Sequence, residues 1–322
     1  MFAVKPWGTL NTGEAVDLIT LTSEAGAAVE ISNFGGIIRS LTIPMPDRSS
    51  RQVVLNYETL EEYVTGRFYL GATVGPYANR IRGGQFSIDG RSYQLEQNEG
   101  ENTLHSGETG WDGVCFDYEA DADQILLTWH SSDGEGGFPG NVDVRIRFHW
   151  KTPLALEIDY SATTDQPTIL SMTNHSYFNL GTEDTILAHK LWLRADAYTP
   201  VDESLLPTGE IAPVADTTLD FTTLRPIREA YDHNFALTSG DGSVATLVSP
   251  RGDLTMNVFT DKPGIQLYSG GGLGAPFVPY AGLCLETQHF PDAPNIDAFP
   301  SAIVMPEVAY RSTTVFDFRT CD

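Results

Sequence analysis

The chain has few cysteines and no long apolar run, and each shortage excludes a class of protein. It contains three cysteines, Cys115, Cys284 and Cys321, which lie far apart and form no C-x-x-C pair. This pattern offers no disulfide framework and fits a reducing cytoplasm. No apolar run approaches the roughly 20 residues that span a bilayer, and the N-terminus lacks the apolar core of a signal peptide. The sequence therefore predicts a cytoplasmic protein with no membrane partner.

Basic residues are also scarce. Lys and Arg total 19 against 43 Asp and Glu, which gives the chain of 322 residues a formal net charge of −24. Such a surface repels phosphate backbones and anionic membranes, so we expect no nucleic-acid partner. It also disfavours a phosphorylated substrate, because no local cluster of arginines is visible to overcome the overall field. The acidity itself is typical of a highly soluble protein.

Period-two alternation dominates the chain and predicts strands. Apolar residues alternate with polar ones over 142–150, 156–160 and 254–258, as in half-buried strands. Residues 86–95, with Asp89-Gly90 at their centre, read as a hairpin with a tight turn. Helical patterns are few and short, with one over 57–64. The pattern predicts an all-β fold, a large antiparallel β-sandwich with few short helices, built as a single domain over residues 1–322.

One carboxylate near the C-terminus stands out. In the run 281–286, Leu283 and Leu285 alternate with Cys284 and Glu286, so an extended backbone turns Glu286 away from the leucine face. A carboxylate held rigidly at the end of a strand has the properties of a general base. A solvated glutamate at the end of a strand is the simpler interpretation of this residue taken alone.

Two histidines lie in polar surroundings. His175 lies in the segment 173–180, which follows the apolar run 168–170. His105 lies in a glycine-bounded turn within 98–107. With a reference pKa of about 6.5, such a histidine can donate a proton near neutral pH. Two histidines and a carboxylate could also hold a metal. No H-x-H or H-x-x-x-H spacing supports that, so we expect no metal.

Polar residues in three further segments offer hydrogen bonds to a hydroxylated ligand. Asn79 and Arg80 are adjacent, Asp232 lies between aromatic residues, and Gln266 presents an amide on a predicted strand. Each has a structural interpretation when taken alone; Arg80, for example, could pair with one of the many carboxylates. Trp111 could stack on a sugar face or cover part of the core.

Taken together and in order, these segments resemble the aldose 1-epimerase family, the galactose mutarotases. Each match is short, but together they extend from about Gly71 to Asn295 and are highly specific. The matching pieces are Asn79-Arg80-Ile81, Asn102-Thr103-Leu104-His105, Gly137-Phe138-Pro139-Gly140-Asn141, 173–180, 206–211, Asp232-His233-Asn234-Phe235, Pro263-Gly264-Ile265-Gln266 and Leu285-Glu286-Thr287-Gln288.

The resemblance implies a sandwich of the galactose mutarotase type with an open groove on one sheet. It implies interconversion of the α and β anomers of a free aldohexose, such as galactose or glucose, without a cofactor. By carry-over, Glu286 is the general base, starting ionised, and His175 the general acid, starting protonated, which confines activity to an intermediate pH window. The residues implied to bind the sugar are Asn79, Arg80, His105, Asp232 and Gln266. A monomer and a homodimer are both compatible with the sequence.

The chain departs from the family pattern at two places, and three other functions remain open. Gly75-Pro76-Tyr77 stands where Gly-Arg is frequent, and Ser106 stands where a glycine is common. A non-catalytic carbohydrate-binding sandwich would need no acid–base pair. A glycoside hydrolase would need two carboxylates roughly 5–9.5 Å apart, with Asp232 as the only plausible second one. The third alternative is a relative that acts on hexose 6-phosphates.

Overall fold

Alternating apolar and polar residues build the largest sheet, as the sequence predicts. In β13 the apolar residues from Val142 to Phe148 are buried, and the charged residues between them are exposed. The computed structural model describes residues 1–321, in which this sheet has nine strands. In spatial order they are β11 (Asp117–Ala120), β12 (Gln124–Ser131), β13 (Val142–Thr152), β14 (Ala155–Thr164), β28 (Tyr310–Thr320), β24 (Leu254–Thr260), β23 (Ala245–Val248), β18 (Lys190–Leu193) and β21 (Arg225–Pro226).

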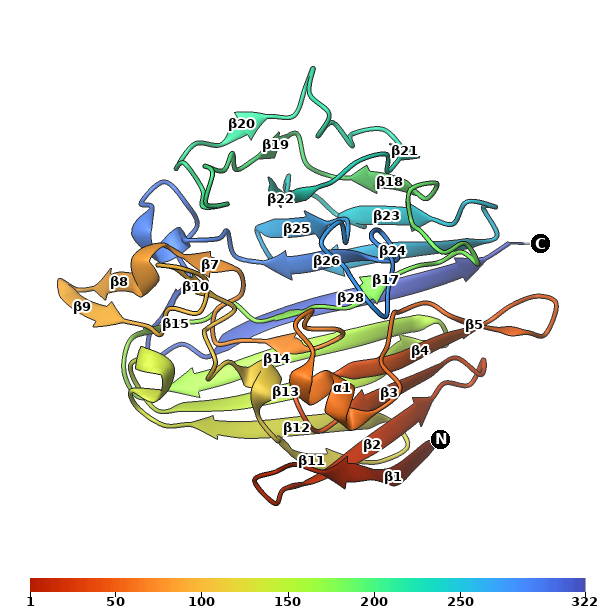
Figure 1. Cartoon of the computed structure of the whole chain (residues 1–322), viewed down its shortest axis with the longest axis horizontal. Coiled ribbons are helices and arrows are strands. Elements are labelled where there is room, and N and C mark those ends of the chain that lie inside the picture. Colours follow the sequence, from red (N-terminus) through yellow and green to blue (C-terminus); the bar gives the residue numbers. More distant parts are fainter. Residues whose placement is uncertain (322) are drawn as a thin grey trace.

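Two smaller sheets are also antiparallel (Figure 1). The N-terminal sheet follows chain order, and its strands are β1 (Phe2–Thr9), β2 (Ala15–Thr22), β3 (Ala28–Ser32), β4 (Ile38–Pro44) and β5 (Ser50–Gln52). The six-stranded sheet consists, in spatial order, of β17 (Tyr177–Phe178), β26 (Leu283–Gln288), β25 (Gly264–Tyr268), β22 (Asp232–Ala236), β19 (Ala197–Tyr198) and β20 (Ala212–Pro213).

One hydrophobic core joins the three sheets. Ile31 of β3, Ile146 of β13 and Leu267 of β25 are each 0% exposed and belong to the same cluster of buried side chains. Burial of apolar area on this scale is the main favourable term in folding. The architecture is therefore the all-β sandwich predicted from the alternation, and the shared core supports our proposal that the chain forms one domain.

Short ribbons and one helix complete the fold. The predicted hairpin is present as β8 (Gln85–Ile88) and β9 (Arg91–Gln94), and Asp89 and Gly90 in its turn both have positive φ. The helix α1 (Leu60–Thr65) starts three residues later than predicted, because a capping box between Thr59 and Glu62 fixes its first turn. The other ribbons are β7 (Arg80–Ile81) with β10 (Thr103–Leu104), β6 (Thr73–Val74) with β16 (Thr173–Asn174), and β15 (Thr168–Ile169) with β27 (Ile303–Val304).

The remaining helical segments are single 3₁₀ turns, at Arg82–Gly84, Trp111–Gly113, Glu135–Gly137 and Ala293–Asn295. Across residues 1–321, every helix is too short or too polar to cross a bilayer.

Candidate active site

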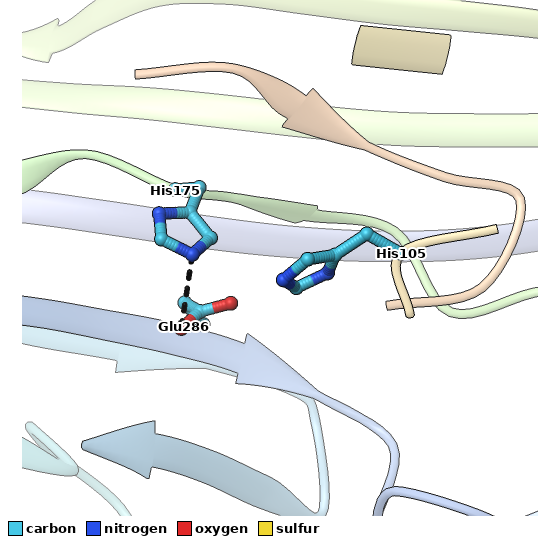
Figure 2. Close-up of side chains that lie close together, drawn as sticks. All are labelled: His105, His175 and Glu286. Carbon is cyan, nitrogen blue, oxygen red and sulfur yellow. Dashed lines mark ion pairs between the residues drawn. The ribbon is translucent and has the colours of Figure 1, made fainter. Parts of the chain in front are cut away.

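Strand β26 carries Glu286 into the interior. Leu283 and Leu285 of this strand lie in the main core, so Glu286 points to the opposite face, as the alternation predicts. That face is not solvated, because Glu286 is only 2% exposed and both His105 and His175 lie close to its carboxylate (Figure 2). The interpretation of Glu286 as a solvated glutamate is therefore wrong.

His175 reaches Glu286 through a strand pairing. It lies between β16 and β17, and β17 pairs with β26 through Tyr177 and Cys284. His175 Nε2 is 3.7 Å from Glu286 Oε1, the ion pair dashed in Figure 2, and Nδ1 is 3.5 Å from Cys284 Sγ. The first distance is longer than a hydrogen bond, so each group remains free to bind a ligand atom of its own.

The ribbon of β7 and β10 brings the second histidine to the same place. The N–H of His105 donates to the carbonyl of Asn79 at 2.9 Å, and the N–H of Asn79 donates to His105 Nδ1 at 3.2 Å. Because Nδ1 accepts a hydrogen bond, neutral His105 carries its proton on Nε2. Figure 2 shows the ring of His105 pointing toward the gap between His175 and Glu286. His105 is therefore arranged as a hydrogen-bond donor.

Arg80 follows Asn79 and is fixed by a carboxylate from the loop before β10. Its Nε and Nη2 donate to Glu99 at 2.6 and 2.7 Å, in a two-pronged geometry that holds a guanidinium in one plane. The structural interpretation of Arg80 is thus correct in part. The Arg80 side chain also lines the cavity above Glu286, with 7% of the residue exposed, so pairing does not remove it from the site.

Gln266 comes from β25, which pairs with β26, and Asp232 comes from β22, the next strand along the sheet. Gln266 lies directly opposite Glu286 across β25 and β26, and its amide donates to Asp232 Oδ1 at 2.6 Å. Asp232 lines the cavity, whereas Gln266 is 3% exposed and lies behind it. Gln266 Oε1 and Glu286 Oε2 are buried acceptors without a partner among the described residues. Unpaired buried acceptors are costly, and Glu286 lines the cavity, so its Oε2 indicates a place where a ligand's hydroxyl group binds.

Except for Gln266, the predicted site residues line a cavity of about 190 Å³. It is smaller than the roughly 300–1,000 Å³ pockets that enclose drug-sized molecules, so it suits a small polar ligand. Its lining comprises Arg67, Phe68, Tyr69, Asn79, Arg80, Leu104, His105, His175, Tyr177, Asp232, Tyr268 and Glu286.

Burial shifts the two central groups in opposite directions. It raises the pKa of Glu286 well above its usual value, and the nearby Asp232 charge adds to this, while Arg80 opposes it. Burial lowers the pKa of His175 to about 4. We expected an ionised Glu286 and a protonated His175 at the start. Burial instead favours the neutral form of each, because both charges are withdrawn from water.

The same three side chains could be read as a metal site. The ligand atoms of His105, His175 and Glu286 lie within 4.8 Å of one another. A metal would need a lone pair on His105, but the hydrogen bond from Asn79 places the proton on Nε2, the nitrogen left for a ligand. The positive charge of Arg80 in the same lining further opposes a divalent cation. Donation to an oxygen atom fits these contacts better.

A larger hollow of about 710 Å³ lies on the outer face of the nine-stranded sheet. Its polar groups, such as the His130–Asp143 pair, are exposed. Exposed groups stay in contact with water, whereas Glu286 and His175 are buried together. We therefore place the chemistry in the smaller cavity.

The chain matches the family model described as "Aldose 1-epimerase" over residues 17–317. It is 34% identical to an aldose 1-epimerase of Escherichia coli, with 95% of this chain and 96% of that protein covered. It is 36% identical to a galactose mutarotase of Mus musculus, with 95% of each covered. The chain belongs to the aldose 1-epimerase family. It is an isomerase, as the residues that carry the resemblance imply.

Solved structures agree with this epimerase assignment. A GalM/aldose epimerase homologue from C. elegans superimposes with a TM-score of 0.92 at 26% identity, covering 96% of this chain and 100% of that one. A galactose 1-epimerase from Lactobacillus acidophilus gives 0.88 at 27% identity, covering 100% and 99%. The fold is therefore that of the galactose mutarotases, as predicted.

Two features of this epimerase were ambiguous in the sequence. Trp111 is 1% exposed and belongs to the main core, so its core interpretation is correct. The departures at Tyr77 and Ser106 contact each other: the Ser106 hydroxyl accepts from the Tyr77 N–H at 2.8 Å and donates to the Tyr77 carbonyl at 3.0 Å. The Tyr77 side chain is fully buried and donates to the Phe290 carbonyl, outside the cavity lining.

Sequence reasoning missed several residues of the site in this epimerase, and three of them contact residues that it predicted. Glu99 fixes Arg80, Cys284 faces His175, and Tyr69 packs its ring 4.6 Å from that of His105. Glu99 lies in the segment 98–107 that also contains His105. It could have been predicted, because a buried arginine needs a carboxylate partner. Tyr69 lies in a loop without a distinctive pattern, so only long-range packing reveals it.

Proposed function

We propose that this epimerase interconverts the α and β anomers of a free aldohexose, such as galactose or glucose, with Glu286 as general base and His175 as general acid. The observation that carries the proposal is the buried pair itself. A gap of 3.7 Å separates Nε2 of His175 from Oε1 of Glu286, and both groups line a small polar cavity.

The reaction opens a hemiacetal and closes it on the other face. Glu286 takes the proton from the O1 hydroxyl while His175 gives a proton to the ring oxygen O5, and the C1–O5 bond breaks. The aldehyde then rotates about C1–C2. Closure returns each proton by the reverse route, so no net redox change or group transfer occurs. Positioned acid–base catalysis contributes about 10²–10⁴-fold per group.

The opposed pKa shifts suit this exchange of protons. A carboxylate whose pKa is raised by burial is a stronger base than one in water, and an imidazolium whose pKa is lowered is a stronger acid. Ring opening converts this charged pair into neutral Glu286 and neutral His175, the forms that the buried site favours. The pair holds one proton throughout, so opening relieves the cost of two buried charges.

The remaining groups would bind the sugar. His105 and Arg80 supply donors for O5 and the ring hydroxyls, and Arg80 would stabilise charge that develops there. Asp232, which accepts a hydrogen bond from the Gln266 amide, would also accept hydrogen bonds from the sugar hydroxyl groups. The Asn79 N–H would hold His105 in the tautomer that donates from Nε2.

Optical rotation tests the activity. Fresh α-galactose and α-glucose, dissolved with the wild-type protein, should reach anomeric equilibrium far faster than in buffer alone. Binding of the sugar without faster equilibration would contradict the proposal and favour a carbohydrate-binding sandwich. A panel of aldoses in the same assay would identify the preferred sugar.

A further inference from the structure

A second cavity lies beside the turn that joins β24 to β25. It has a volume of about 270 Å³ and shares no lining residue with the sugar cavity. Its walls come from residues 261–263, from His289, from the segment 301–304 that includes β27, and from Tyr310 and Arg311 at the start of β28. The cavity therefore has walls from four separate parts of the chain.

A buried lysine forms one wall. The chain has four lysines, at positions 5, 151, 190 and 262. Lys5 pairs with Glu30, Lys151 pairs with Glu157, and Lys190 is exposed. Lys262 is only 8% exposed, and its Nζ lies 4.1 Å from the centre of the Tyr310 ring. Among residues 1–321, no carboxylate oxygen lies within 4.0 Å of that ammonium group.

This arrangement is unusual for a chain with 43 acidic residues. Withdrawing an ammonium from water is costly unless an opposite charge or several hydrogen bonds replace the water. The π face of the Tyr310 ring attracts the ammonium only weakly and accepts no conventional hydrogen bond from it. Within residues 1–321, the Lys262 ammonium therefore lacks the anionic partner that a buried cation ordinarily has.

The other groups lining the cavity leave an excess of positive charge. Arg311 adds a second cation at the exposed rim. His289 is uncharged at neutral pH, because burial and the nearby Lys262 lower its pKa to about 3. Among the residues that the structure describes, its Nδ1 has no hydrogen-bond partner and is buried. Asp261 is the one carboxylate in the lining, and its Oδ1 already accepts from the Thr313 N–H at 3.1 Å.

We propose that this Lys262 cavity binds a phosphate group, either free or in a small phosphomonoester, between the Lys262 ammonium and the Arg311 guanidinium. Arginine and lysine are the side chains that proteins use to bind phosphate oxygens. The cavity is slightly below the roughly 300–1,000 Å³ range of drug-sized ligands, so it suits a small anion. This site is separate from the sugar cavity and does not depend on the epimerase activity.

The four lysines make the test direct. In the full-length protein labelled with ¹⁵N-lysine, inorganic phosphate is titrated at constant ionic strength while the Nζ signals are followed. The Lys262 signal should shift in a saturable way, and the exposed Lys190 should not. A parallel titration with glycerol 3-phosphate distinguishes the two sources: saturation with inorganic phosphate alone assigns the free anion, and saturation with both assigns a phosphomonoester site.

Calorimetry of variants completes the test. K262M should lower phosphate affinity at least tenfold, R311Q should lower it less, and K190M should leave it unchanged. K262Q, which keeps a polar side chain, should behave like K262M. All four variants should retain the wild-type rate of anomer equilibration in phosphate-free buffer. A Lys262 signal that follows ionic strength as Lys190 does, or equal phosphate binding by K262M, would overturn the proposal.

Discussion

Glu99 fixes the Arg80 guanidinium in the wall of the sugar cavity through two hydrogen bonds, 2.6 Å from Nε and 2.7 Å from Nη2. A guanidinium held at two points keeps one orientation when the sugar arrives, so less conformational entropy is lost on binding. It also brings a positive charge near Glu286, which opposes the rise in the pKa of that carboxyl.

The E99Q variant tests this positioning. It removes the charge that holds Arg80, so we expect kcat/KM to fall roughly tenfold, or about 1.4 kcal/mol, mainly through a higher KM. Without the negative charge of Glu99, the positive charge of Arg80 acts more strongly on Glu286 and lowers the pKa of Glu286. The basic limb of the pH profile should therefore move to lower pH. E101Q, in the same loop and exposed, serves as the control. Unchanged kinetics in E99Q would contradict the role of Glu99.

The pH profile tests the opposed shifts of the acid–base pair. Glu286 and His175 provide both a base and an acid only when the two side chains together carry one proton. Because the pKa of His175 is lowered to about 4, the second proton binds only near that pH, and kcat/KM should stay flat through mildly acidic pH before it falls. On the basic side, activity is lost when the raised pKa of Glu286 is passed. An acid limb near the ordinary histidine value of about 6.5 would contradict the burial argument.

The contact between Ser106 and Tyr77 predicts a loss of stability. S106A removes both hydrogen bonds and leaves a buried N–H unpaired, which costs about 1–3 kcal/mol of unfolding free energy. Ser106 has a φ of 74°, so S106G relieves backbone strain and should lose less than S106A. Urea unfolding midpoints check this order, with the exposed S92A, expected within about 0.5 kcal/mol of wild type, as control. Equal midpoints for S106A and wild type would show that these bonds contribute nothing.

Local patterns predicted the sheet architecture and the side of the strand on which Glu286 lies. Alternation decides which face of a strand a residue occupies, and it can be recognised from adjacent residues in the sequence. The late start of α1 was also readable, because Thr59-x-x-Glu62 is a capping-box signature that we overlooked. The identity of the site residues came from the family resemblance, since single polar residues have structural interpretations of equal weight.

Long-range pairing decided what the patterns could not. Alternation gave Glu286 a polar face, but that face is buried because His105 and His175 arrive from segments more than 100 residues away. The contact of Cys284 with His175 depends on the register between β17 and β26. The neutral preference of the acid–base pair follows from this burial, which no local pattern shows.

The central claim is that Glu286 is the base that removes the O1 proton, and E286Q tests it most directly. Glutamine keeps the shape of the side chain but cannot accept that proton. Exchange between the anomers of galactose, followed by NMR at equilibrium, should slow at least 10²-fold relative to wild type, while galactose affinity by calorimetry changes only a few-fold. A variant that binds galactose and exchanges its anomers at nearly the wild-type rate would contradict the account.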